Sequence, residues 1–287
     1  MTARRLDGKD LAARLRAQAA DAVAAAAAGG TTVRLAIVTA TQDESAAWYV
    51  RSLSGAAARA GIECEIADLG AHAAPGQIEA ELARLSADAA VHGIILQTPV
   101  PAGATAADLA EALDPAKDVD GANPVSLGRL TAGLPAFAPA TAEAVMQLLD
   151  FHGVELSGRR AVVVGRSAVV GKPVAQLLLA RDATVTICHS RTPDLAGVTR
   201  EAEVLVAAAG RPGLITSAHV RPGAVVVDVG TSTTADGSLV GDVGAAVTEV
   251  AGALSPVPGG VGPVTTAQLL RATTVAAARR RGSGMLR

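Results

Sequence analysis

The chain has 287 residues, half of them apolar, which is enough material for two ordinary domains with buried cores. Its net charge of −2 gives no general attraction to nucleic acid or anionic lipid. No apolar run approaches the roughly 20 residues that span a bilayer, and the N-terminus has no apolar signal-peptide core. We therefore expect a cytoplasmic protein that binds neither nucleic acid nor membrane.

Helix and strand signals alternate through the first part of the chain. Apolar, β-branched runs indicate buried strands, and longer periodic segments that end at glycine indicate helices. Helices are predicted at 10–28, 43–60, 78–87 and 105–113, and strands at 33–40, 62–69 and 93–97.

A Pro/Gly-rich passage at 114–139 interrupts this alternation, which then restarts. Because the strands are apolar throughout and separated by helices, they imply parallel sheets covered on both faces. The predicted fold class is α/β with two domains that meet near residue 138. In the second half, strands are predicted at 160–165, 183–190, 203–210 and 224–230, and helices at 142–153, 174–182 and 264–281.

Cysteine and histidine are too scattered to indicate a metal site. Cys64 and Cys188 lie in unrelated segments without CxxC or Cys/His spacing, and the five histidines lack the spacing of a helix-borne site. We expect neither a metal ion nor a disulfide framework.

The most informative short element is GRSAVVGKP, from Gly165 to Pro173, between a predicted strand and a predicted helix. Such a glycine-bearing turn aims backbone N–H groups and a helix N-terminus at one point, which suits a pyrophosphate. The spacing is not GxGxxG, so an ordinary strand-to-helix turn remains the alternative.

The end of the next strand bears on the choice of cofactor. NAD-binding folds usually carry an acidic residue about 20 positions after the glycine turn, to bind the ribose hydroxyls. Here the strand ends in CHSR, without an acid. Ser190 and Arg191, together with Arg166, would instead accept a 2′-phosphate, which favours NADP over NAD. The alternative is that these are solvent-facing loop residues.

Several further stretches follow one another along the chain: LQTPVPAG (96–103), KDVDG (117–121), GRSAVVGKP (165–173), CHSRT (188–192), AAGRPG (208–213), VVDVGTS (226–232) and SPVPGGVGPVT (255–265). In this order they resemble one family, the bifunctional methylenetetrahydrofolate dehydrogenase/cyclohydrolases. The resemblance implies an N-terminal α/β folate-binding domain (1–138, completed by helix 263–287), a Rossmann-like NADP-binding domain (139–262), a cleft between them and a homodimer. It also implies oxidation of 5,10-methylenetetrahydrofolate by NADP, followed by hydrolysis to 10-formyltetrahydrofolate.

The resemblance and the residue types together give a set of candidate site residues. Asp120 can accept hydrogen bonds from the paired N–H donors of a pterin, although a turn-forming Asp before Gly121 is the plainer interpretation. Gln97 ends a buried strand, where its amide can face the ligand or cap the strand. The candidates for substrate binding are Tyr49, Gln97, Asp120, Pro258, Gly259 and Gly260. The candidates for cofactor binding are Gly165, Arg166, Ser167, Gly171, Pro173, Ser190, Arg191, Gly210 and Thr231.

One position departs from the family at the expected catalytic set of Tyr49, Leu53, Gln97 and Asp120. In the family, the helix after the first strand carries a Tyr that stacks on folate and, four residues later, a Lys that moves protons. Tyr49 matches the Tyr, but the Lys position is Leu53. A leucine can mimic the aliphatic stem of lysine but cannot carry a proton.

Three functional hypotheses follow. The first is an NADP-dependent methylenetetrahydrofolate dehydrogenase with weak or absent cyclohydrolase activity. The second is a relative repurposed for another folate- or pterin-dependent reaction, suggested by Leu53, Thr98, Ala122 and Asn123. The third is a non-catalytic subunit that binds folate and NADP beside an active partner.

Overall fold

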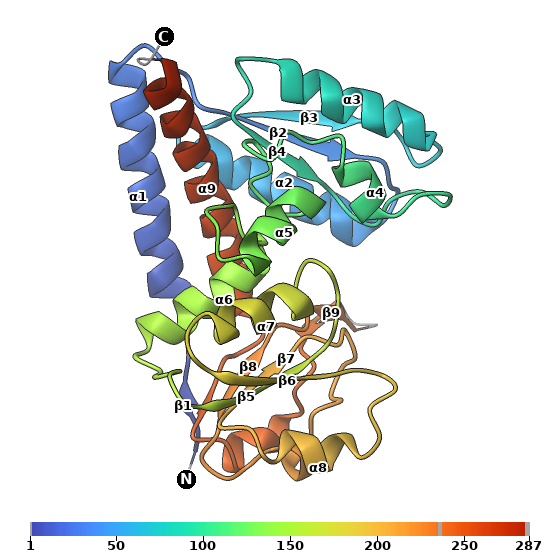
Figure 1. Cartoon of the computed structure of the whole chain (residues 1–287), viewed down its shortest axis with the longest axis vertical. Helices are drawn as coiled ribbons and strands as arrows, with labels where there is room; N and C mark the ends of the chain where they lie inside the picture. Colours follow the sequence, from blue (N-terminus) through green and yellow to red (C-terminus); the bar gives the residue numbers. More distant parts are fainter. Residues whose placement is uncertain (1, 235–236, 285–287) are drawn as a thin grey trace. The chain divides into compact units, whose positions relative to one another are not determined.

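The computed structural model describes residues 2–234 and 237–284. The chain forms two compact units (Figure 1). Unit 1 comprises Met1–Ala12 and Thr141–Thr265, and unit 2 comprises Ala13–Ala140 and Thr266–Arg287. The domain ranges 1–138 with 263–287, and 139–262, stay a prediction from the sequence, and their residues 1, 235–236 and 285–287 lie outside the described part.

Unit 2 is built on a three-stranded parallel sheet in the order β3 (Glu63–Asp68), β2 (Arg34–Thr39), β4 (Gly93–Leu96). Alternate residues of β2 face opposite layers, as the two-residue period of a strand requires. Leu35 and Ile37 pack into a core with α1 (Lys9–Ala28), α2 (Glu44–Arg59) and α9 (Val261–Gly284). Ala36 and Val38 pack into a second core with α3 (Pro75–Ala87) and α4 (Ala106–Ala110) on the other face.

Helix α2 shows how the sequence specifies the local structure. It begins where the Asp43 side chain accepts a hydrogen bond from the Ala46 backbone N–H (2.8 Å), a standard N-cap. Its buried residues Ala46, Val50, Leu53 and Ala57 recur every three or four positions and form one apolar stripe against the core. Leu53 therefore lies on the buried face of the helix.

Helix α5 (Pro124–Thr131) lies within the passage that the sequence analysis left without regular structure. Asn123 is its N-cap and accepts a hydrogen bond from the Val125 N–H at 2.7 Å, while Pro124 occupies the first helical position. An Asn-Pro pair of this kind is a recognised helix start, because the missing N–H of proline has no intrahelical partner to lose.

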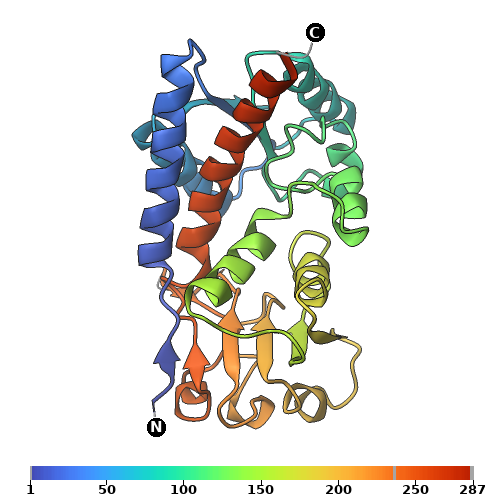
Figure 2. The same ribbon diagram turned by 60° about the vertical axis from the view of Figure 1, so that its left-hand side comes forward.

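Unit 1 contains a six-stranded parallel sheet, drawn from a second direction in Figure 2. Helix α7 (Gly171–Leu179) packs against β5 (Arg160–Val164) and β6 (Thr184–Cys188). The other helices of this unit include α6 (Ala140–Phe151), α8 (Leu195–Thr199), η1 (Ser217–His219) and η2 (Ala245–Glu249). A short antiparallel pair, β9 (Ser232–Thr233) and β10 (Leu239–Val240), follows β8 (Val225–Asp228). The order of the sheet is β1 (Arg4–Arg5), β11 (Ala253–Leu254), β8 (Val225–Asp228), β7 (Val204–Ala207), β5 (Arg160–Val164), β6 (Thr184–Cys188).

The predicted two-domain α/β class with parallel sheets is confirmed. Among the described residues, no helix is both long and apolar enough to cross a bilayer.

Candidate functional site

The predicted cofactor residues gather at one edge of the unit 1 sheet. Because the strands are parallel, the turns that follow β5, β6, β7 and β8 all leave from the same edge, where open α/β sheets bind their ligands. The turn after β5 contains Gly165 to Gly171, and Ser190 and Arg191 follow β6. Gly210 follows β7, and Thr231 follows β8.

The turn after β5 is tight, and glycine is required at both its ends. Gly165 has a φ of +137°, and a side chain there would collide with the carbonyl of Ala208. A side chain at Gly171 would collide with the carbonyl of Gly165. Between them the Ser167 hydroxyl accepts from the N–H groups of Val170 (3.2 Å) and Gly171 (3.3 Å). Ser167 therefore caps the start of α7, and the buried Pro173 lies in its first turn.

The basic and hydroxyl groups at this edge are open to solvent. Arg166, Ser190 and Arg191 are all exposed. The Gly165 N–H donates to the Cys188 carbonyl (2.9 Å), which ties the end of β5 to the end of β6 and brings these two turns side by side. A guanidinium pair beside a hydroxyl is a suitable receptor for a phosphate monoester.

The segment with Pro258, Gly259 and Gly260 folds against the beginning of α1. The Gly8 N–H donates to the Gly259 carbonyl at 2.8 Å, and a side chain at Gly8 would collide with the Gly260 carbonyl. Gly259 and Gly260 are buried, whereas Pro258 is exposed. At these glycines the backbone of residues 259–260 therefore lies close to the backbone of Gly8, within unit 1.

In unit 2, Tyr49, Asp120 and Thr266 form a polar corner at the edge of the core. Tyr49 comes from α2, Asp120 from the loop 117–121 and Thr266 from α9. The Tyr49 hydroxyl is hydrogen-bonded to the Thr266 hydroxyl. Burial, and then the nearby charge of Asp120, raise the pKa of Tyr49 above its ordinary value, so the phenol stays protonated. Nothing in the sequence signalled Thr266, because its contact with Tyr49 exists only in the folded chain.

Asp120 is the acidic group of this corner, and its carboxylate form is destabilised by its surroundings. Loss of hydration, and then the neighbouring charge of Asp118, raise the pKa of Asp120 to about 7, against a hydrogen bond from the Ala140 N–H that lowers it. Asp120 is partly exposed. Near neutrality the carboxyl of Asp120 can therefore either accept hydrogen bonds or hold a proton.

The rest of the Asp120 loop is committed to the fold. Lys117 is buried, and its ammonium group donates to the carbonyls of Leu85 (3.0 Å) and Asp88 (2.6 Å) at the C-terminal end of α3. Asp118 is buried and accepts from the N–H groups of Ala122 (3.0 Å) and Asn123 (2.9 Å). These anchors hold the loop, and Asp120 is its partly exposed carboxylate.

Asn123, which the sequence analysis considered an altered pocket residue, is also part of the fold. Its amide donates to the carbonyls of Ala110 and Leu113, both at 2.9 Å, and its side-chain oxygen caps α5. Gln97 lies directly after β4 and is partly buried, and its amide donates to the carbonyl of Thr98 at 2.6 Å. The side-chain amide of Gln97 is therefore bonded to the backbone of the next residue.

Leu53 lies one helical turn after Tyr49 and is 1% exposed. It belongs to the apolar core that also contains Val50 and Ala57, and Tyr49 packs against this core. The side chain at position 53 therefore supplies no hydrogen-bonding or ionisable group to the polar corner.

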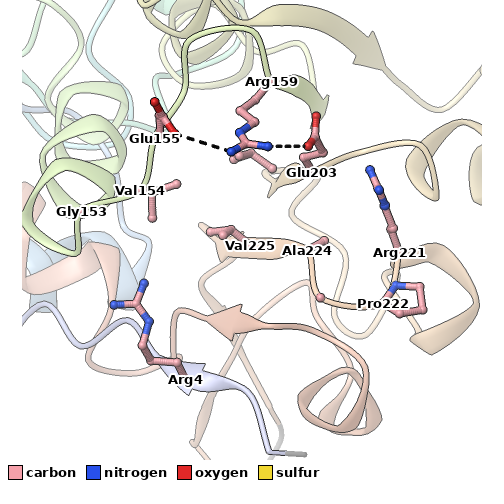
Figure 3. Close-up of a pocket in the computed structure, with 12 residues that line it drawn as sticks. Arg4, Gly153, Val154, Glu155, Arg159, Glu203, Arg221, Pro222, Ala224 and Val225 are labelled. Atoms are coloured by element: carbon pink, nitrogen blue, oxygen red, sulfur yellow. Dashed lines mark hydrogen bonds and ion pairs between the residues drawn. The ribbon is translucent and has the colours of Figure 1, made fainter.

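A pocket of about 430 Å³ lies at the opposite edge of the unit 1 sheet, where β5, β7 and β8 begin (Figure 3). Arg159 stands between Glu203 (2.9 Å) and Glu155 (3.6 Å), and Arg4 donates to the carbonyl of His152. Because these cations already have partners and the strands point away from this edge, we assign no ligand to the pocket.

The comparisons with known proteins agree on one family. A model of the tetrahydrofolate dehydrogenase/cyclohydrolase catalytic domain matches residues 6–120, and a model of the NAD(P)-binding domain of the same family matches residues 139–281. Bifunctional protein FolD 1 of Saccharopolyspora erythraea is 61% identical over 275 residues, which cover 96% of this chain and 94% of that protein.

Two solved structures show the same fold over nearly the whole chain. The bifunctional FolD dehydrogenase/cyclohydrolase of Campylobacter jejuni superposes with a TM-score of 0.93 at 36% identity. The match covers 96% of this chain and 98% of the Campylobacter chain. The corresponding enzyme of Trypanosoma brucei, complexed with NADP cofactor and inhibitor, has a TM-score of 0.92 at 36% identity, with coverages of 98% and 99%. The predicted family, and with it an enzyme with a nicotinamide dinucleotide cofactor, are confirmed. The chain belongs to the tetrahydrofolate dehydrogenase/cyclohydrolase family.

Proposed function

We propose that this protein oxidises 5,10-methylenetetrahydrofolate to the 5,10-methenyl form with NADP as the hydride acceptor, and that its cyclohydrolase activity is weak or absent. The observation that carries the proposal is the buried Leu53 beside an otherwise complete corner of Tyr49, Asp120 and Thr266. The family and the full-length relatives named as dehydrogenase/cyclohydrolases support the reaction class.

Hydride transfer can proceed without a lysine at position 53. The substrate's own nitrogen lone pair expels the hydride, so the protein must mainly hold the two ligands in line. Tyr49 supplies an aromatic face for the pteridine ring, and the carboxylate of Asp120 supplies an acceptor for its N–H donors. Both groups are present in this chain, in which residue 53 is a leucine.

Hydrolysis of the methenyl form has a stricter requirement, because a water must be activated and protons must move. A positioned acid or base contributes about 10²–10⁴-fold to such a step. Lys117, the lysine within residues 13–140 and 266–287, is buried with its ammonium group on two carbonyls. Arg51 and Arg59 on α2 are exposed, and arginine stays protonated and is a poor general base. Asp120 is occupied when it binds the pteridine.

NADP is favoured over NAD by Arg166, Ser190 and Arg191 at the carboxyl edge of the unit 1 sheet. The experiment compares kcat/KM for NADP and NAD in the dehydrogenase reaction, in the wild type and in Arg191→Gln. We expect a wild-type preference for NADP that falls roughly tenfold in the variant, the effect of one charged hydrogen bond. Arg200→Gln, which removes another exposed cation of unit 1, should keep the preference. A wild type that reduces neither dinucleotide with methylenetetrahydrofolate would contradict the proposed function.

The family resemblance leads us to propose that the protein works as a homodimer, and we keep the cytoplasm as its expected location. Sedimentation of the purified protein tests the dimer, and a monomer at the concentrations of the assay would contradict it.

A further inference from the structure

Two buried carboxylates lie beneath the edge of unit 1 that carries the cofactor residues. Asp228 ends β8 and is 4% exposed, and Asp242 follows β10 and is fully buried. They are linked directly, since the Asp242 backbone N–H donates to the Asp228 carboxylate at 2.9 Å. Buried carboxylates are costly unless hydrogen bonds compensate their charge. The hydrogen-bond donors to Asp228 and Asp242 identify the segments that the two carboxylates connect.

Asp242 is surrounded by the turn that follows β7. One of its oxygens accepts from the N–H groups of Ala209 (2.6 Å) and Gly210 (2.9 Å), and the other accepts from the N–H of Arg211 (2.7 Å). Successive N–H groups that converge on one point form a concave anion-binding site of the kind that elsewhere receives phosphate. In this chain that site already holds the protein's own carboxylate.

Asp228 extends the network to the neighbouring turns. Its carboxylate accepts from the N–H groups of Gly230 (2.9 Å) and Val243 (3.0 Å), and its backbone N–H donates to the hydroxyl of Ser255 (2.8 Å). The turns after β7 and β8, the segment after β10 and the segment after β11 are thus fastened to one another through two side chains.

The order of the strands indicates which half of a dinucleotide meets the turn 208–211. β6 and β7 flank β5 on opposite sides. A cofactor with its 2′-phosphate at Ser190 and Arg191, after β6, and its pyrophosphate at the turn 165–171, after β5, extends its nicotinamide half over the end of β7. The N–H groups of 209–211 are occupied by Asp242, and Gly210 leaves open space where a side chain would stand, so this turn can approach that half closely.

We propose that Asp242 is a positioning residue for the dinucleotide, which fixes the turn 208–211 in the shape that receives the nicotinamide half. This inference rests on the proposed use of NADP. Asp242→Asn tests it, because the amide keeps one acceptor oxygen but turns an NH₂ donor toward backbone N–H groups. The turn must then move, whereas the bonds to the Ser167 hydroxyl in the turn 165–171 and the bond from the Arg191 N–H to His189 do not involve Asp242.

The experiment measures by calorimetry the affinity of the folded protein for two probes, NADP and adenosine 2′,5′-bisphosphate. The second probe contains the 2′-phosphate half but no nicotinamide. In Asp242→Asn we expect NADP to bind roughly tenfold more weakly and the bisphosphate to bind as in the wild type. Glu203→Gln is the matched control. It alters a carboxylate that also accepts a backbone N–H (from Arg160, 3.1 Å), but at the opposite edge of the same sheet, and should leave both affinities unchanged.

The outcomes separate the two proposals. A wild type that binds no NADP contradicts the proposed function and this inference together. If the wild type binds NADP and Asp242→Asn binds it equally well, only this inference is overturned. Equal weakening of both probes also overturns it, because a general loss of structure would do the same. Asp242→Ser serves as a second variant if the first does not fold, and failure of both to fold overturns the positioning role.

Discussion

The two candidate ligand regions of this protein are built in different ways. At the carboxyl edge of unit 1, backbone turns make the surface, with Gly165 and Gly171 allowing close contacts and Asp228 and Asp242 fixing the turns from below. In unit 2, the polar corner is made of side chains from α2, the loop 117–121 and α9.

This difference bears on the expectation from the sequence that the cofactor turn follows the family pattern while position 53 departs from it. A surface made of turns constrains many residues at once, because each glycine and each N–H is needed by its neighbours. A corner made of side chains can change its chemistry at one position and keep its fold. Under our proposal Leu53 is such a change: it fills the core beside Tyr49, and a leucine carries no proton.

Restoring the lysine should have the largest effect. In Leu53→Lys we expect hydrolysis of methenyltetrahydrofolate to rise about 100-fold, the lower end of what a positioned acid or base contributes. The ammonium group would reach the polar corner from the end of a stem that replaces the leucine. The rate of methenyl loss above its spontaneous rate measures the effect. Leu53→Met fills the same space without a charge and should give no gain. If the lysine variant is folded but no faster, the corner has changed beyond one side chain.

Removing the Asp120 carboxylate should have the next largest effect. Asp120→Asn replaces an acceptor of charged hydrogen bonds by an amide, which should lower kcat/KM for methylenetetrahydrofolate roughly 10–100-fold and leave the KM for NADP unchanged. Asp108→Asn is the control, since Asp108 is an exposed carboxylate of unit 2 that caps α4. An equal loss in both variants would show that Asp120 has no special contact with the substrate.

The raised pKa of Asp120 predicts a pH dependence. Its carboxyl, with a pKa of about 7, is ionised and accepts hydrogen bonds above that pH and is protonated below it. The kcat/KM for methylenetetrahydrofolate should therefore be level above pH 7 and fall by up to about tenfold for each pH unit below it. In Asp120→Asn the fall of kcat/KM below pH 7 should be absent. A wild-type profile that is flat through neutrality would contradict the assignment.

The smallest effect is expected at Thr266, whose hydroxyl is bonded to that of Tyr49. Thr266→Val removes this bond with little change of shape and should raise the KM for methylenetetrahydrofolate about 2–10-fold, the value of one neutral hydrogen bond. Thr266→Ser keeps the hydroxyl and should restore the wild-type KM. If the serine variant is as poor as the valine variant, packing rather than the hydrogen bond positions Tyr49.

Much of the fold could be predicted from the sequence, because apolar periodicity reports which face of each element is buried. The stripe of Val50, Leu53 and Ala57 on α2 is an example. Helix α5 was missed although its signal is present: the capping residue Asn123 and Pro124 at the first position were outweighed by the surrounding prolines and glycines.

The candidate site was predictable only in part. The turn from Gly165 to Gly171 is local, so its glycines reveal it in the sequence. The roles of Asp242 and Thr266 depend on segments far apart in the chain, since Asp242 binds the N–H groups of 209–211 and Thr266 binds Tyr49. No local pattern carries that information.

The central claim is that the corner with Leu53 supports hydride transfer but not hydrolysis. The most direct test follows both reactions in parallel on the wild-type protein: reduction of NADP with methylenetetrahydrofolate, and loss of added methenyltetrahydrofolate beyond its spontaneous rate. We predict NADP reduction without accelerated hydrolysis. Accelerated hydrolysis by the wild-type protein would contradict the account, because it would show that the reaction proceeds without a proton carrier at position 53.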